Sequence, residues 1–217
     1  MSASAWRAMD RSSLAFDTGG EQIARAAALQ IAQNLDEQCS LQEIIWNNRD
    51  QDWAAAIGIA YQPTRIIRPQ KSSIYLGAQP SLVAGENARF DKWPAVTCRC
   101  GARSPSADQA DQWDNLDLEL VIEVLAQAGP FAVDPLDDRS TSDAIDRQYQ
   151  RLSDAVVACI DLDRSLGTGI PPISLPPRMI PSLPFVKREK AGAGRWLLYQ
   201  GMELSWTVTG LHRVPGL

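Results

Sequence analysis

Nine residues near the middle of the chain alternate between apolar and mainly acidic side chains. Successive side chains of a β-strand point to opposite faces of a sheet, so this pattern predicts a strand over 116–125 with one buried face and one acidic face in water. Gly129-Pro130 is expected to end it. A strand with one apolar face needs a second layer to cover that face. The apolar positions are Leu116, Leu118, Leu120, Ile122 and Val124, and those between them are Asp117, Glu119, Val121 and Glu123.

Other stretches predict further strands and helices. Apolar residues recur every three or four positions in two stretches, which is typical of amphipathic helices. The tetrad Ser40-Leu41-Gln42-Glu43 fits a capping box, which predicts that a second short helix begins there. A polar loop is expected over 101–115. In chain order the expected elements are a helix over 21–38, a short helix over 41–47, irregular strands over 65–77, strands over 94–100 and 116–125, a helix over 142–164, and a strand over 196–209 that is either continuous or divided at Gly201.

This order predicts an α+β fold. We expect a two-layer sandwich in which a mainly antiparallel sheet carries helices on one face. The 217 residues, 45% of them hydrophobic, suffice for one domain with its own core. We therefore expect a single domain over 19–210, an N-terminal arm over 1–18 and a C-terminal tail over 211–217 that includes His212.

A proline-rich stretch over 167–194 interrupts the regular pattern. Its six prolines oppose a helix or a central strand, and its apolar residues are unusual for a solvated linker. We interpret it as a long loop insertion that contacts a partner, and expect that deleting 170–186 leaves the core folded. Trp6 in the arm and Trp113 in the polar loop are further candidates for interface contacts. The candidates within the loop are Ile173, Leu175, Met179, Ile180, Leu183 and Phe185.

The chain carries few residues suited to catalysis. Its one histidine, His212, lies near the C-terminus, and Cys98-x-Cys100 lacks the spacing of a zinc or redox motif, so the cysteines of this motif are expected in the core. We expect no enzyme activity, no cofactor and no metal. One alternative remains, a small metal-assisted hydrolase that uses the carboxylates of Asp134, Asp137 and Asp138.

The charge balance narrows the range of partners. With 21 Lys and Arg against 26 Asp and Glu, the net charge of −5 disfavours a protein that wraps nucleic acid. No apolar run reaches the length of a membrane span, and Met1 to Asp10 lack the apolar core of a secretory signal. The acidic face formed by Asp117, Glu119 and Glu123 is either a solvated sheet face or a wall that repels passing DNA.

The order of elements resembles that of the tail terminator proteins of long-tailed bacteriophages. In that family an N-terminal helix precedes a strand that begins with an aromatic–Pro–Ala/Val phrase, here Trp93-Pro94-Ala95-Val96. The alternating strand from Leu116 to Val124 follows. Acidic turn residues then introduce a helix, here Asp137-Asp138 and the stretch from Asp143 to Ile160. The last match is the terminal strand phrase Trp206-Thr207-Val208-Thr209.

The resemblance implies a structural virion protein. Members form a hexameric ring that caps the tail tube, stops its polymerisation and docks to the neck or head-completion protein, while DNA passes through the hole without specific binding. Such a protein assembles in the host cytoplasm and resides in the virion. Two alternatives stay open, a head-completion or adaptor subunit of the same neck, and an interaction module of a non-viral assembly.

Overall fold

The computed structural model of the chain describes most of the expected elements. The ranges that it describes are 19–77, 94–105, 115–131, 139–167, 173, 176–181, 185–188 and 195–212.

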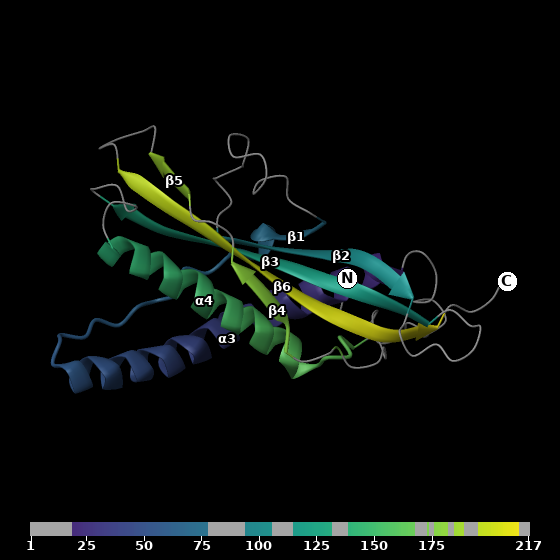
Figure 1. Ribbon diagram of the computed structural model, residues 1–217, viewed down its shortest axis with the longest axis horizontal. Helices are drawn as coiled ribbons and strands as arrows, with labels where there is room; N and C mark the ends of the chain where they lie inside the picture. The colour runs from purple at the N-terminus through teal and green to yellow at the C-terminus, as the bar shows by residue number, and fades with distance from the viewer. Residues whose placement is uncertain are drawn as a thin grey trace.

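A six-stranded mixed sheet forms one layer of the molecule (Figure 1). Along the sheet the strands follow the order β1-β2-β3-β6-β4, and β5 also pairs with β6. Only the pairing of β1 with β2 is parallel, and the others are antiparallel. The strands are β1 (Ile74–Leu76), β2 (Ala95–Pro105), β3 (Asn115–Phe131), β4 (Arg178–Pro181), β5 (Phe185–Arg188) and β6 (Trp196–His212).

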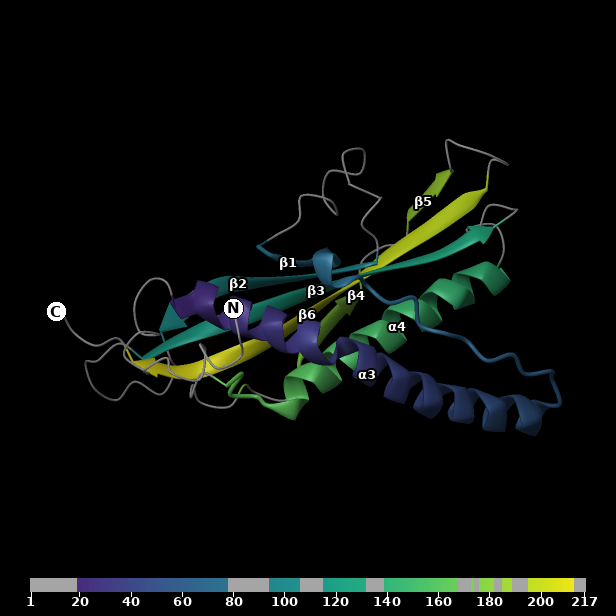
Figure 2. The same ribbon diagram turned by 180° about the vertical axis from the view of Figure 1, so that it is seen from behind.

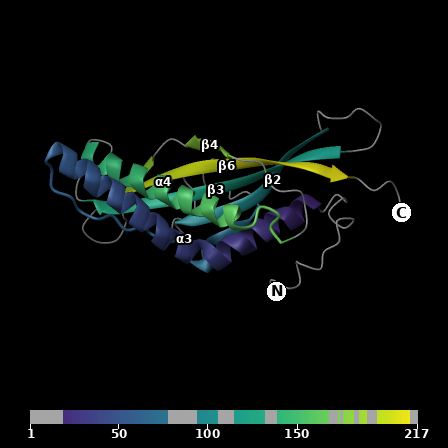
Figure 3. The same ribbon diagram turned by 90° about the horizontal axis from the view of Figure 1, so that it is seen from below.

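Two long helices form the second layer. They are α3 (Gly19–Ile57) and α4 (Arg139–Leu162), and a short 3-10 helix, η1 (Lys71–Ser73), precedes β1. Both long helices lie on the same side of the sheet, as the views from behind and from below show (Figures 2 and 3). The α+β sandwich expected from the sequence is therefore confirmed.

The core lies between the two layers. The apolar side chains of β3 that were expected on one face, including Leu120 and Ile122, are fully buried. Leu204 and Trp206 of β6 lie opposite them in register, and the helices supply apolar residues such as Ile31 and Val156. Dispersion and the loss of apolar surface to water stabilise this interior.

The first helix is longer than expected. The stretches 21–38 and 41–47 form one continuous helix that also takes in Trp53 and is about 58 Å long. The capping box does not start a helix, because the Ser40 hydroxyl donates back to the Asp36 carbonyl, 3.0 Å away, within the helix. The Glu43 carboxylate instead accepts a hydrogen bond from the backbone N–H of Ile66 at 2.7 Å.

Residues 59–70, here called the crossing segment, run back from the end of α3 along the two helices. The irregular strands expected over 65–77 are confirmed only at Ile74–Leu76, because the N–H groups of Ile66 and Ile67 donate to side chains of α3 and α4. The Asn47 side chain both donates to the Thr64 carbonyl and accepts from its N–H. Side chains, rather than a neighbouring strand, hold this segment in place.

Several strands run past their expected ends. β2 extends into the expected polar loop to Pro105, and β3 passes Gly129-Pro130 to Phe131 with a shift of register at that point. β6 is continuous through Gly201 and reaches His212, which pairs with Asn115 rather than lying in a tail. Each of these long strands provides backbone hydrogen bonds for its neighbour, and this support cannot be predicted from the sequence of one strand alone.

The proline-rich stretch is not wholly a loop. β4 and β5 both pair with β6 on the side away from β3, at positions where Met179 faces Leu204 and Val186 faces Leu198. Proline is tolerated here because β4 lies at an edge of the sheet. Ile173 is buried in the core. Deleting 170–186 would therefore remove a core residue and sheet residues, so the structure argues against the expectation that the core survives this deletion.

Candidate interaction surfaces

The second half of α3 exposes large apolar side chains on its outer side. We call Leu41, Ile44 and Ile45, which are 45%, 59% and 43% exposed, the α3 stripe. Spacings of three and four residues place them on adjoining turns of one helix face. Apolar residues at such spacing normally face a core, so their exposure marks this face as a candidate contact surface.

The other sides of this half-helix are occupied. Trp46 donates to Asp154 of α4 at 2.9 Å, and Asp50 forms an ion pair with Arg151 of α4. Glu43 and Asn47 hold the crossing segment. The α3 stripe therefore faces away from both α4 and the crossing segment.

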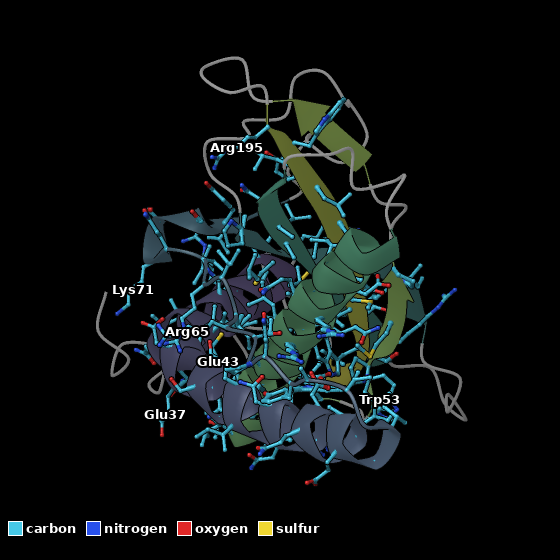
Figure 4. All side chains as sticks on the ribbon, turned by 90° about the vertical axis from the view of Figure 1, so that its left-hand side faces the viewer. Glu37, Glu43, Trp53, Arg65, Lys71 and Arg195 are labelled. Carbon is cyan, nitrogen blue, oxygen red and sulfur yellow. The ribbon has the colours of Figure 1, made fainter. Side chains whose placement is uncertain are left out.

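The end of α3 carries further exposed apolar residues. Trp53 is 57% exposed, and Ile57 and Ile59 are each 51% exposed. Gly58 adopts a φ of +72° and ends the helix. Its N–H donates to the Ala55 carbonyl at 3.3 Å, while the N–H of Ile59 donates to that of Ala54 at 3.0 Å, the two bonds of a Schellman motif. Figure 4 shows Trp53 at this end of the helix.

A second exposed patch lies on β4, the strand at one edge of the sheet. All four residues of β4 are exposed, and Met179 and Ile180 are 43% and 39% exposed. We call Arg178, Met179 and Ile180 the β4 patch, which wraps around the edge of the sheet because Met179 lies on the helix-facing side and Arg178 and Ile180 lie on the other face. The two apolar side chains were predicted as interface residues, and their exposure is compatible with that role.

Of the remaining predicted interface residues, one is buried and the structure does not describe the side chains of the others. Ile173 is only 2% exposed and belongs to the core, so it is not available at the surface of this molecule. Its N–H also donates to the Arg164 carbonyl at 3.2 Å, which fixes it beside the end of α4. Phe185 lies in β5, where the structure describes the backbone only. Trp6, Trp113, Leu175 and Leu183 lie outside the described residues.

The sheet face away from the helices carries paired charges. Arg99 of β2 reaches Glu123 of β3 at 3.4 Å and Glu203 of β6 at 3.0 Å, and Thr97 donates to Glu123 at 3.3 Å. The Glu123 side chain is only 14% exposed. This predicted acidic residue is thus engaged in an ion pair. Of the other two, Glu119 is half-buried and the side chain of Asp117 lies outside the described part of the structure.

A buried polar cluster joins the two helices to the crossing segment. Arg151 is 1% exposed, pairs with Asp50, and donates to the side-chain Oδ1 of Asn47 at 3.2 Å. Its guanidinium carbon also lies 5.8 Å from the centroid of the Trp46 ring. Burial raises the pKa of Asp154 above its usual range, which the hydrogen bond from Trp46 and the charge of Arg49 partly offset. Sequence reasoning missed this cluster, although Arg151 lies three residues after Gln148 and four residues before Ala155, at the margin of the buried face of α4.

The cysteines are unsuited to thiolate chemistry. Cys39, Cys98 and Cys159 are buried, and Cys100 is half-buried against the core. Burial raises the pKa of Cys39 and Cys159 to about 12 and also raises that of Cys98. The core role predicted for Cys98 and Cys100 is confirmed. The described ranges contain no group of three or more potential ligand side chains that could hold a metal ion, and Asp134, Asp137 and Asp138 lie outside those ranges.

Comparisons with known proteins leave the family open. No protein-family model matches the chain, and no curated protein matches its sequence. Among the helices that the structure describes, none is both long and apolar enough to span a membrane. The exposed patches are therefore the most informative guide to function.

Proposed function

We propose that the chain is a ring-forming structural subunit of the tail terminator type, which caps the tail tube of a long-tailed bacteriophage and joins it to the neck. The observation that carries this proposal is a pair of separate exposed apolar patches, the α3 stripe on the helix layer and the β4 patch at an edge of the sheet. A subunit of a ring needs two different surfaces, one for each neighbour.

The rest of the fold agrees with this proposal. The α+β sandwich has the element order that the resemblance implies, with a long helix before the sheet and α4 between β3 and the last strand. Among the described residues, the face away from the helices carries Glu119, Glu123 and Glu203, with Arg99 beside Glu123 and Glu203 and with Arg178 on the edge strand. An excess of carboxylates on a face that borders a DNA passage would limit phosphate binding.

The first experiment measures the mass of the purified protein by light scattering and images it by negative-stain microscopy. We expect a ring of about six copies of the 23.8-kDa chain with a central hole. Because some subunits of this type assemble only on the tube, the protein is also added to growing tail tubes. Tubes of limited length with a cap at one end support the proposal. A monomer that leaves tube growth unchanged contradicts it.

A further inference from the structure

We propose that the α3 stripe of one copy docks on the β4 patch of the next copy, so that the subunits associate head to tail. This inference rests on the proposed ring and identifies the two surfaces that form its repeated contact. The occupant of each patch is thus a second copy of this chain.

The two patches cannot meet within one molecule. α3 packs beside β1 and β2, whereas β4 is the strand at the other end of the sheet order. In Figures 1 and 3, α4 lies between α3 and β4. Since the α3 stripe faces away from α4, it also faces away from its own β4. Two separate and different patches are the requirement for a heterologous contact.

The charges around the patches favour this pairing over a symmetric one. Glu37 and Asp52 are exposed and flank the α3 stripe on the same helix face, four residues before Leu41 and seven residues after Ile45. Figure 4 shows Glu37 on the outward side of α3. Two α3 stripes packed against each other would bring acidic flanks together, whereas the β4 patch offers the exposed Arg178.

Each patch also has a nearby charge of the opposite sign, and that charge already contacts another side chain. Arg49, the basic residue beside the α3 stripe, lies with its guanidinium carbon 5.5 Å from the centroid of the Trp46 ring. Glu203, the β6 partner of Ile180, forms an ion pair with Arg99. Among the described residues, the exposed flanking charges without such a partner are Glu37 and Asp52 on α3 and Arg178 on β4, so Arg178 can pair with the acidic flanks of the α3 stripe.

The local backbone of β4 favours a helix as its occupant. Pro177 precedes β4 and Pro181 is its last residue, and proline has no N–H to donate to an added strand. These prolines disfavour extension of the sheet at this short edge, so we expect a neighbour to contact its side chains. A helix that presents three apolar side chains on adjoining turns meets that condition.

Single-face variants test the pairing. Ile44→Asp places a carboxylate in the α3 stripe, and Ile180→Asp places one in the β4 patch. Both side chains are exposed, so both variants should keep the wild-type circular dichroism spectrum and urea midpoint. Gln150→Asp adds the same charge at an exposed position of α4 and serves as the control. We expect each single-face variant to raise the dissociation constant of association at least about 30-fold, while the control leaves it unchanged.

Mixing the two variants separates head-to-tail from symmetric association. A mixture retains one intact contact, between the α3 stripe of the Ile180→Asp chain and the β4 patch of the Ile44→Asp chain. It should form heterodimers and no larger species. A wild-type ring that survives in the Ile44→Asp variant would overturn the inference and leave the proposed function standing. So would an Ile180→Asp variant that still dimerises on its own, because that result shows symmetric α3 pairing.

Other outcomes bear on the proposed function separately. Open chains of wild-type protein that both variants disrupt would support the head-to-tail contact and contradict the ring. If the wild type assembles only on tail tubes, the fraction of capped tubes replaces the dissociation constant, and capping by Ile44→Asp at the wild-type level overturns the inference. A wild type that neither associates nor caps tubes overturns both.

Discussion

Arg151 shows how a single charged residue can lie in the interior of this molecule. An isolated buried guanidinium is strongly unfavourable, and here Asp50, Asn47 and the Trp46 ring provide an ion pair, a hydrogen bond and a cation–π contact. Arg151 also donates to the Thr64 carbonyl at 3.4 Å. Its side chain therefore connects both helices and the crossing segment, and removing it should destabilise the packing of all three.

We predict that Arg151→Ala lowers the free energy of unfolding by about 3 kcal/mol, because it leaves Asp50 and the buried acceptors without their donor. The matched control is Arg164→Ala, which removes an exposed ion pair with Asp161 and should cost less than about 1 kcal/mol. Urea unfolding followed by circular dichroism measures both values. Equal losses in the two variants would mean that the buried cluster contributes nothing beyond a surface pair.

The raised pKa of Asp154 predicts a pH-dependent contribution to stability. At pH values between the ordinary pKa of 3.8 and the higher pKa of the folded state, the folded protein binds more protons at this carboxyl than the unfolded chain does. This contribution to stability is present in full below 3.8 and is lost as the pH rises through the folded-state pKa.

Asp154→Asn should remove this pH dependence while keeping an acceptor for the Trp46 N–H. We expect the free energy of unfolding of the variant, relative to the wild type, to increase as the pH is raised from 3 to 7. Urea unfolding at several pH values measures the difference. A difference that is constant or shrinks with rising pH would contradict the assigned role of Asp154.

At the scale of elements, α3 shows what a sequence pattern can and cannot specify. The helical periodicity of its first half correctly predicted Ile23, Ala27, Ile31 and Leu35 on the buried face. The break expected at Ser40 was wrong because its capping residues make other contacts, which depend on the crossing segment and cannot be seen in a local window.

Gly58 fixes the point where α3 ends and the crossing segment begins. Its positive φ is unfavourable for residues with a Cβ, so Gly58→Ala should destabilise the protein by about 1 kcal/mol even though the added methyl group would meet open space. Gly58→Asn should lose less, since asparagine tolerates this conformation better. Thermal unfolding of the two variants measures the order. A loss for Asn equal to or above that for Ala would show that φ is not the cause.

The candidate surfaces were harder to predict than the core. The α3 stripe has the three- and four-residue spacing of a buried helix face, but it lies on the side of α3 away from α4 and the crossing segment, which local spacing does not specify. The β4 patch was predicted as an apolar contact region, but its strand was missed since prolines oppose a central strand and only the pairing with β6 shows that this is an edge. Burial of Ile173 likewise depends on the end of α4.

At the scale of the whole molecule, α4 lies between the helix that carries the α3 stripe and the edge strand that carries the β4 patch (Figures 1 and 3). Contacts between such patches relate neighbouring copies by a rotation that either closes a ring or continues as an open chain. The two cases differ in how size depends on protein concentration. A closed ring has a fixed number of copies, whereas an open chain keeps growing.

We therefore predict that the mass of the wild-type protein, measured by light scattering over increasing concentration, rises to a plateau at a whole-number multiple of 23.8 kDa and then stays constant. The plateau follows from closure, because a closed ring leaves no free α3 stripe or β4 patch for a further copy. The equimolar mixture of Ile44→Asp and Ile180→Asp chains is the matched control and should level off at two copies. A wild-type mass that climbs without limit would show that the contact repeats without closing, and the subunit would then build a filament rather than a cap.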